Sequence, residues 1–255
     1  MSIEYKKNYI KNFLVRFDLE TKLNEGEYDK IQNILRDKFP IKETKNIENR
    51  ELIINTEDKN NPKPILSEPN LKVQSVLYNA EKNERISINS DSIIYESLQY
   101  KSFSNIKPIL ENIIDCLNKE YGIKNFNRIG LRYVNLIKIP IKEKKDIFNW
   151  RGYINSQFLS NNNFINDNNL LQEIKTIDFN LDKEKDLLCR LQIGIPNRNM
   201  PADLVEKLYI IDIDGYTNSL VEQEDAIDIL KLIHDKNVEI FEKCIDDKLR
   251  SDMNE

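Results

Sequence analysis

Asn127-Arg-Ile-Gly-Leu-Arg-Tyr-Val-Asn-Leu-Ile-Lys-Ile-Pro140 is the stretch that decides the fold of this chain. Apolar and polar residues alternate along most of it, which is typical of a β-strand with one buried face. We expect one face to pack into the core and the other to carry the charged residues. The predicted core face holds Ile129, Leu131, Tyr133, Asn135, Ile137 and Ile139, and the opposite face holds Arg128, Gly130, Arg132 and Lys138.

The composition is that of a globular protein. The chain has 255 residues, of which 40% are hydrophobic and 32% charged, so it can bury a core as one large domain or two small ones. The formal net charge of -5 argues against a broadly basic surface for nucleic acid, but it leaves room for a local arginine patch. With six glycines and no glycine-rich phosphate loop, the usual nucleotide-binding loops are nearly excluded.

The cysteines and the N-terminal residues indicate the compartment. Cys116, Cys189 and Cys244 are far apart and odd in number, so the sequence favours neither a disulfide framework nor a C-x-x-C metal site. No apolar signal core and no run of about 18 apolar residues occurs. We therefore expect a cytoplasmic protein that has no membrane span.

The first half of the chain is predicted to form strands and two helices. The first helix follows a capping pair, Asn24 and Glu27, and runs from Tyr28 to Pro40. A long helix is predicted to start at a Ser104 cap and to end at Gly122, with Pro108 tolerated in its first turn. Strands are predicted over residues 12–19, 51–56, 71–80, 85–95 and the opening stretch.

The second half repeats strands followed by a long helix. After a charged link at 142–146 we expect a short helix at 149–158, a polar loop at 161–169, strands at 174–181, 187–195 and 208–216, and a helix at 223–249. The predicted class is α+β, with a mostly antiparallel sheet packed against long amphipathic helices. The halves, 1–140 and 141–255, could form one continuous domain, and both suggest a duplicated hairpin-plus-helix unit.

Arg128 and Arg132 admit two interpretations. On one side of a strand they stand about 7 Å apart, with the backbone of Gly130 open between them, which suits a phosphate or carboxylate. Alternatively they pair across strands with Asp212 and Asp214, which also share a face; this interpretation is favoured. In a third interpretation the two aspartates bind a metal ion, with Mg²⁺ as the cofactor, although the sequence shows no further metal ligands at a defined spacing from them.

His234 and Asn135 fall on predicted core faces. His234, the only histidine, shares the apolar side of the last helix with Leu230, Val238 and Phe241. A general base would need a nucleophile and an orienting acid beside it, so a hydrogen-bonded core or interface histidine is the preferred interpretation. Asn135 needs hydrogen-bond partners and could tie its strand to a helix end.

The stretch Arg128-Ile-Gly-Leu-Arg-Tyr-Val-Asn135, with Ile211-Asp-Ile-Asp214, Ile233-His234 and Phe241-Glu242, resembles a sporadically distributed family of prokaryotic proteins defined by an R-I-G-L-R-Y-x-N core. The resemblance spans nearly the whole chain, but it departs after Glu242, where Lys243-Cys-Ile-Asp246 replaces a threonine-containing stretch. If the motif marks a site, the matching positions are Arg128, Arg132, Asn135, Asp212, Asp214 and His234. Patchy occurrence implies mobile or defence-linked genes.

Two functions follow as expectations. The first is a non-catalytic binding or accessory protein, of a prokaryotic defence or toxin-antitoxin locus, that contacts a protein partner or a second copy of itself. The absence of a complete catalytic set favours it. The second is a nucleic-acid or nucleotide-handling protein with an anion site at Arg128, Arg132 and Asn135 and a metal at Asp212 and Asp214.

Overall fold

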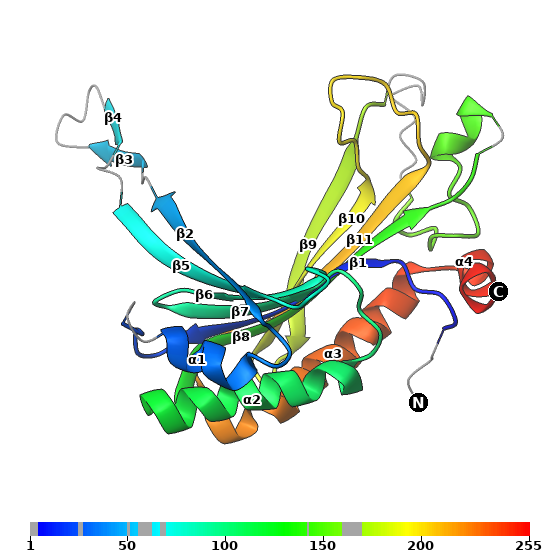
Figure 1. Ribbon diagram of the computed structural model, residues 1–255. Helices are drawn as coiled ribbons and strands as arrows, with labels where there is room; N and C mark the ends of the chain where they lie inside the picture. The colour runs from blue at the N-terminus through cyan, green and yellow to red at the C-terminus, as the bar shows by residue number, and fades with distance from the viewer. Residues whose placement is uncertain are drawn as a thin grey trace.

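A computed structural model describes residues 5–24, 28–49, 52–55, 63–66, 70–141, 143–159 and 170–255. It shows helices packed on one large antiparallel sheet (Figure 1). The elements are β1 (Ile10–Leu19), α1 (Tyr28–Leu35), β2 (Ile41–Asn49), β3 (Leu52–Asn55), β4 (Lys63–Leu66), β5 (Asn70–Tyr78), β6 (Glu84–Ile88), β7 (Ser92–Ser97), α2 (Phe103–Tyr121), β8 (Asn125–Lys138), β9 (Glu173–Asp182), β10 (Leu187–Ile195), β11 (Leu208–Thr217), β12 (Val221–Glu222), α3 (Ala226–Cys244) and α4 (Asp247–Asn254), with 3₁₀ helices η2 (Lys144–Phe148) and η4 (Gln223–Asp225).

Strands from both halves of the chain form one sheet of ten strands. Its order is β2-β5-β6-β7-β1-β8-β11-β10-β9, and β12 pairs with β8. The predicted opening strand, β8, lies in the middle, between β1 and β11. The prediction of a mixed fold with a mostly antiparallel sheet is confirmed, although strands outweigh helices; β3 and β4 form a separate pair.

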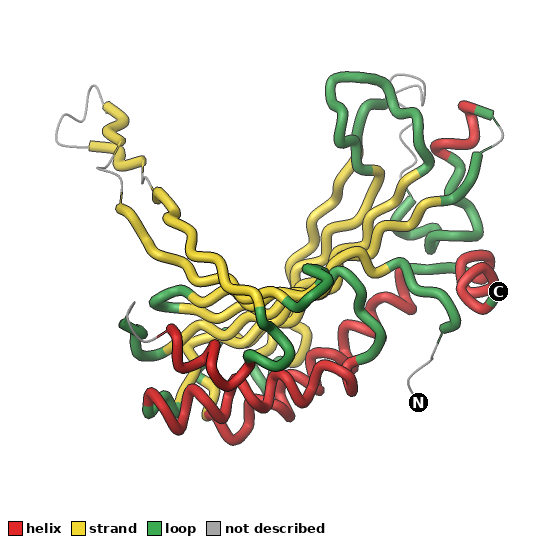
Figure 2. Tube along the Cα trace, in the orientation of Figure 1, coloured by secondary structure: helices red, strands yellow, loops and turns green. Residues whose placement is uncertain are grey.

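The helices α1, α2 and α3 lie on one side of the sheet, which we call the helix face (Figure 1). Both ends of the sheet bend away from these helices, so that the other side, the open face, is concave (Figure 2). Because side chains alternate along a strand, each central strand contributes to both faces.

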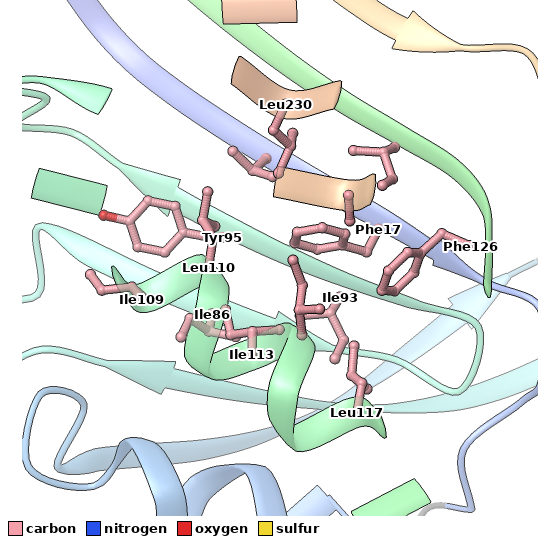
Figure 3. Close-up of a cluster of buried hydrophobic side chains, with 14 of the residues drawn as sticks. Phe17, Ile86, Ile93, Tyr95, Ile109, Leu110, Ile113, Leu117, Phe126 and Leu230 are labelled. Carbon is pink, nitrogen blue, oxygen red and sulfur yellow. The ribbon is translucent and has the colours of Figure 1, made fainter. Parts of the chain in front are cut away.

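The main core lies between the helix face and α2. Phe13, Val15 and Phe17 of β1 are fully buried, as the alternation predicts. The α2 residues Leu110, Ile113 and Leu117 recur at helical spacing, are fully buried, and meet strand side chains such as Phe17, Ile86, Ile93 and Phe126 (Figure 3). The predicted core face of β8 is confirmed in the same way, since Ile129, Leu131, Tyr133, Asn135, Ile137 and Ile139 are all buried.

The ends of α2 follow from local chemistry. Its N-cap is Ser102, whose hydroxyl accepts from the Asn105 amide at 3.4 Å, so the prediction of Ser104 as the cap was two residues late. Ser104 lies in the first turn and its hydroxyl contacts that of Ser102 at 2.9 Å. Gly122 ends the helix with φ +66°, a left-handed conformation that glycine adopts without strain, as predicted.

Two predicted elements differ from the structure and one strand was not predicted. Residues 85–95 form a hairpin, β6 and β7, because the polar residues Asn89–Asp91 turn the chain. The predicted helix 223–249 is broken at Ile245, which is extended and buried, and Asp246 caps the separate helix α4. The strand β2 was missed, because its residues are mostly polar, and those of 41–46 are exposed or only partly buried.

The predicted short helix at 149–158 is instead a series of turns. Its Trp150 is buried and its ring lies 5.0 Å from that of Tyr209, so core packing anchors this segment. Glu27, Lys142 and residues 161–169 lie outside the described residues. Within the part of the chain that the structure describes, no helix has the length and apolar character to cross a membrane.

Two glycines test which face of the sheet is tightly packed. A Cβ at Gly215 would lie 2.6 Å from Ile233 Cγ2 and 2.7 Å from Asn237 Oδ1, both on α3, whereas a Cβ at Gly130 would meet nothing closer than 3.5 Å. We expect Gly215→Ala to lower the free energy of unfolding by about 1–3 kcal/mol. Gly130→Ala, its matched control, should change it by no more than about 0.5 kcal/mol. Urea unfolding measures both, and equal losses would contradict the packing of α3 on Gly215.

Candidate functional site

A cavity of about 490 Å³ lies where β1, β8 and β11 meet the first turn of α2, the second half of α3 and both ends of the described chain. We call it the His234 pocket. It combines apolar walls with a few polar groups, which is the usual character of a ligand site. Residues that define it are Tyr100, Phe103, Tyr133, Asn135, His234 and Phe241.

A chain of hydrogen bonds forms one side of the His234 pocket. The hydroxyl of Tyr133 lies 2.7 Å from His234 Nδ1 and 3.0 Å from the hydroxyl of Tyr100. These residues come from β8, α3 and the loop before α2. The ring of Phe103, in the first turn of α2, stacks on the imidazole with centroids 4.9 Å apart and planes 8° apart. Stacking on Phe103 therefore fixes the plane of the imidazole, and the contact with Tyr133 fixes the position of Nδ1.

Burial keeps all three groups neutral near pH 7. It raises the pKa of Tyr100 to about 12 and that of Tyr133 well above its usual value, because an ionised phenol is poorly solvated there. Burial also lowers the pKa of His234 below 6.5, although Asp235 raises it and Lys231 lowers it further.

The hydrogen bonds of this chain allow more than one proton arrangement. Either hydroxyl can be the donor between Tyr100 and Tyr133, and whether Tyr133 donates to His234 Nδ1 or accepts from it depends on the tautomer of the imidazole. In the tautomer in which Tyr133 donates to Nδ1, the neutral ring carries its proton on Nε2, which has no partner among the described residues. Tyr133 and Phe103 fix the orientation of the ring.

Two buried asparagines hold the sheet side of the pocket. Asn135 donates to the carbonyl of Ile211 at 3.1 Å, so it ties β8 to β11, and the suggested tie to a helix end was wrong. Asn237 of α3 is fully buried and donates to the carbonyl of Leu131 at 2.9 Å. Its Oδ1 has no hydrogen-bond partner in the described structure. These bonds fix α3 and β11 relative to β8.

The two ends of the described chain close another side. The amide of Lys7 donates to the carbonyl of Met253 at 3.0 Å, which joins the N-terminal segment to α4. The hydroxyl of Tyr5 donates to Glu242 at 2.8 Å, and Arg250 contacts the same carboxylate at 3.2 Å. Glu242 is therefore neutralised within the wall.

Three lysines lie at the rim of the pocket. Lys231 pairs with Asp235 at 2.7 Å and Lys107 pairs with Glu111 at 3.6 Å. Lys101 lines the pocket too, and it forms no ion pair within the described part of the chain. The rim therefore carries one cation that has no carboxylate partner.

The arginines and aspartates singled out in the sequence lie on the opposite, open face of the sheet. Strands β8 and β11 are neighbours, with Arg132 opposite Asp214 in the register. Arg132 donates to both carboxylate oxygens of Asp212, at 2.8 and 2.5 Å. Arg128 lies 3.4 Å from Asp214 and 3.8 Å from Asp18 of β1. The cross-strand ion pairs that the sequence favoured are thus present.

Gly130 makes room for this arrangement. It lies opposite Tyr216 in the ladder, and the Arg128 guanidinium packs over the Tyr216 ring at 4.4 Å from its centroid. Burial raises the pKa of Asp214, while Arg128 and Arg132 counter this shift. The bond to Asp212 raises the pKa of Arg132.

These carboxylates do not match a magnesium site. Both oxygens of Asp212, a side chain only 5% exposed, accept from Arg132, whereas Mg²⁺ needs near-octahedral oxygen ligands. Across the described ranges, no group of three or more histidine, cysteine or acidic side chains is placed to hold a metal ion.

Sequence reasoning placed Asn135 and His234 in a candidate site but missed their neighbours. Tyr133 was counted as core, and Tyr100 and Asn237 were not considered. One signal was available for Asn237, because it stands three residues after His234 and so shares its side of the helix. Nothing local to Tyr100 points to Tyr133, since their contact spans 33 residues.

The single histidine makes its titration directly measurable. We expect the imidazole C2 proton in NMR to report a pKa below 6.5 for His234 in the folded protein. The unfolded state then binds more protons than the folded state just below pH 6.5, so His234 makes the free energy of unfolding fall as the pH drops through that window. His234→Gln should remove this contribution. A folded-state pKa of 6.5 or higher would contradict the burial.

Arg132 and Arg190 form a matched pair of bidentate arginines on the open face. Arg190 binds Asp178 at 2.8 and 3.1 Å, but both of these side chains are 55% exposed, whereas Asp212 is buried. We expect Arg132→Met to lower the free energy of unfolding by about 1–3 kcal/mol, because it leaves a buried carboxylate unpaired. Arg190→Met should have little effect. Chemical denaturation measures the free energy of unfolding of both variants. Similar decreases in the two variants would show that the burial of Asp212 is unimportant.

The two candidate sites share β8 but lie on its two faces. Arg128 and Arg132 belong to the open face, and Tyr133 and Asn135 to the His234 pocket. Neither a scan against protein-family models nor a search of the curated proteins finds a match to this chain.

Proposed function

We propose that this chain is a non-catalytic binding protein and that the His234 pocket holds a small organic ligand. The observation that carries the proposal is the ordered chain Tyr100–Tyr133–His234 along the wall of a cavity of about 490 Å³. A cavity of this size accommodates a drug-sized molecule. Buried polar groups whose orientation is fixed by hydrogen bonds are what gives such a site its specificity.

The geometry around His234 supports binding over catalysis. A general base of the triad type is oriented by a carboxylate, whereas Nδ1 of His234 contacts a phenol with a raised pKa. The serine hydroxyls at the rim, Ser102 and Ser104, contact each other, and Ser102 also caps α2. They therefore serve the helix end.

The alternative of a nucleotide or nucleic-acid site at Arg128 and Arg132 has less support. Both guanidinium groups already contact carboxylates, and a phosphate would have to displace Asp212 and Asp214. Three further points stay predictions, namely a protein partner, a cytoplasmic location and a prokaryotic defence or toxin-antitoxin setting. Pull-down from the source cell with the wild-type chain as bait would test the protein partner.

A duplicated unit would account for the strand order. β1 pairs with β7, the last strand of the meander β5-β6-β7, and α2 follows; β8 pairs with β11, the last strand of the meander β9-β10-β11, and α3 follows. In this proposal the boundary between the units lies between α2 and β8, not at residue 140. Superposing β1–α2 on β8–α3 tests it, and strands that fail to coincide would count against it.

Binding in the pocket can be tested by filling it. Val238 lines the pocket from α3, and the exposed Glu239 next to it does not. Screening a library of small metabolites by thermal shift should yield ligands that raise the Tm of the wild type and of Glu239→Trp, but not that of Val238→Trp, because the indole occupies the cavity. If the same ligands stabilise Val238→Trp equally, they bind elsewhere and the proposal is wrong.

A further inference from the structure

We propose that the ligand of the His234 pocket is an organic anion, with an apolar body and one carboxylate-like group. This inference rests on the proposed function and narrows it to a chemical class. Three features carry it, namely the apolar walls, the donor on His234 and the sign of the charge at the rim.

The apolar walls call for an apolar body. Side chains from both hydrophobic clusters of the molecule reach the pocket, so a ligand there would remove water from both. Burial of apolar ligand surface is favourable by about 25 cal/mol per Å². The walls are formed by Ile10, Phe103, Ile213, Val238, Phe241 and Met253.

The donor on His234 calls for an acceptor on the ligand. In this proposal Tyr133 is the donor to Nδ1, which leaves the hydrogen of the neutral imidazole on Nε2, and the Phe103 ring and the Tyr133 hydroxyl hold the imidazole in place. Phenols and a neutral imidazole at this depth present no negative charge that would repel an anionic oxygen. A hydrogen bond to an ionised acceptor is also roughly twice as strong as one to a neutral acceptor.

The rim charge selects an anion. Both acids that line the pocket are already paired, Asp235 with Lys231 and Glu242 with Arg250. Lys101 remains without a carboxylate partner in the described ranges, so the rim of the pocket carries one positive charge that no ion pair in that part of the structure balances, in a chain whose formal net charge is -5. A negatively charged ligand would supply the missing partner.

Three probes that share one body separate the head groups. We would titrate the wild-type chain with 4-phenylbutyrate, 4-phenylbutanol and 4-phenylbutylamine by calorimetry. The acid should bind about tenfold more tightly than the alcohol, and the amine most weakly. NMR should show that the acid raises the pKa of His234, because a nearby anion favours the imidazolium form, while the alcohol does not.

Lys101→Gln isolates the rim charge. It should weaken binding of the acid about twofold to fivefold and leave the alcohol unchanged, as expected for an exposed ion pair. Lys119→Gln, an exposed lysine of α2 that does not line the pocket, is the matched control and should change neither.

The outcomes separate the two proposals. If the acid and the alcohol bind equally and Val238→Trp abolishes both, or if the amine is preferred, the proposal of an anionic ligand is wrong, but the pocket is still the binding site. Binding that survives in Val238→Trp would overturn the pocket itself. Failure of all three probes to bind the wild type would overturn both.

Discussion

The pairing of β1 with β8 is the constraint on which the rest of the structure depends. These two strands form the middle of the sheet, and their register sets Val15 opposite Leu131 and Arg16 opposite Gly130. Because side chains alternate, a slip of one residue would move Arg128 and Arg132 into the core. The pairing joins strands from both halves of the chain into one sheet, and it decides which residues face the helices.

Strand β8 therefore supports different chemistry on its two faces. On the open face, the arginines of β8 are balanced by aspartates on β1 and β11, and this side of the sheet is not covered by helices. On the helix face, Tyr133 and Asn135 occupy positions where purely apolar residues would pack. Each forms hydrogen bonds there, Tyr133 with His234 and Tyr100 and Asn135 with the Ile211 carbonyl. Polar residues kept on a core face fit a surface that contacts a ligand.

The position of the His234 pocket follows from how the core is divided. One hydrophobic cluster lies under α2, and a second gathers Trp150, Ile211 and Leu249 nearer to α4. Asn135 and Asn237 are buried polar residues that line the pocket between them. The pocket takes walls from both clusters, at the place where the side chains that fill the core give way to polar ones. A cavity at such a junction can be lined by fixed polar groups while the clusters keep the fold stable.

The sequence by itself determined the strands whose apolar residues alternate, the turn at Gly122 and the face on which each residue of β8 lies, because these follow from local sterics and side-chain period. It also brought Arg128, Arg132, Asp212 and Asp214 forward as partners. The prediction did not separate β6 from β7, although the polar residues 89–91 turn the chain there, and it could not end α3 at Cys244, since the burial of Ile245 decides that break. Only the tertiary structure set Tyr100, Tyr133 and His234 together, because no local pattern records contacts between residues 33 and 101 positions apart.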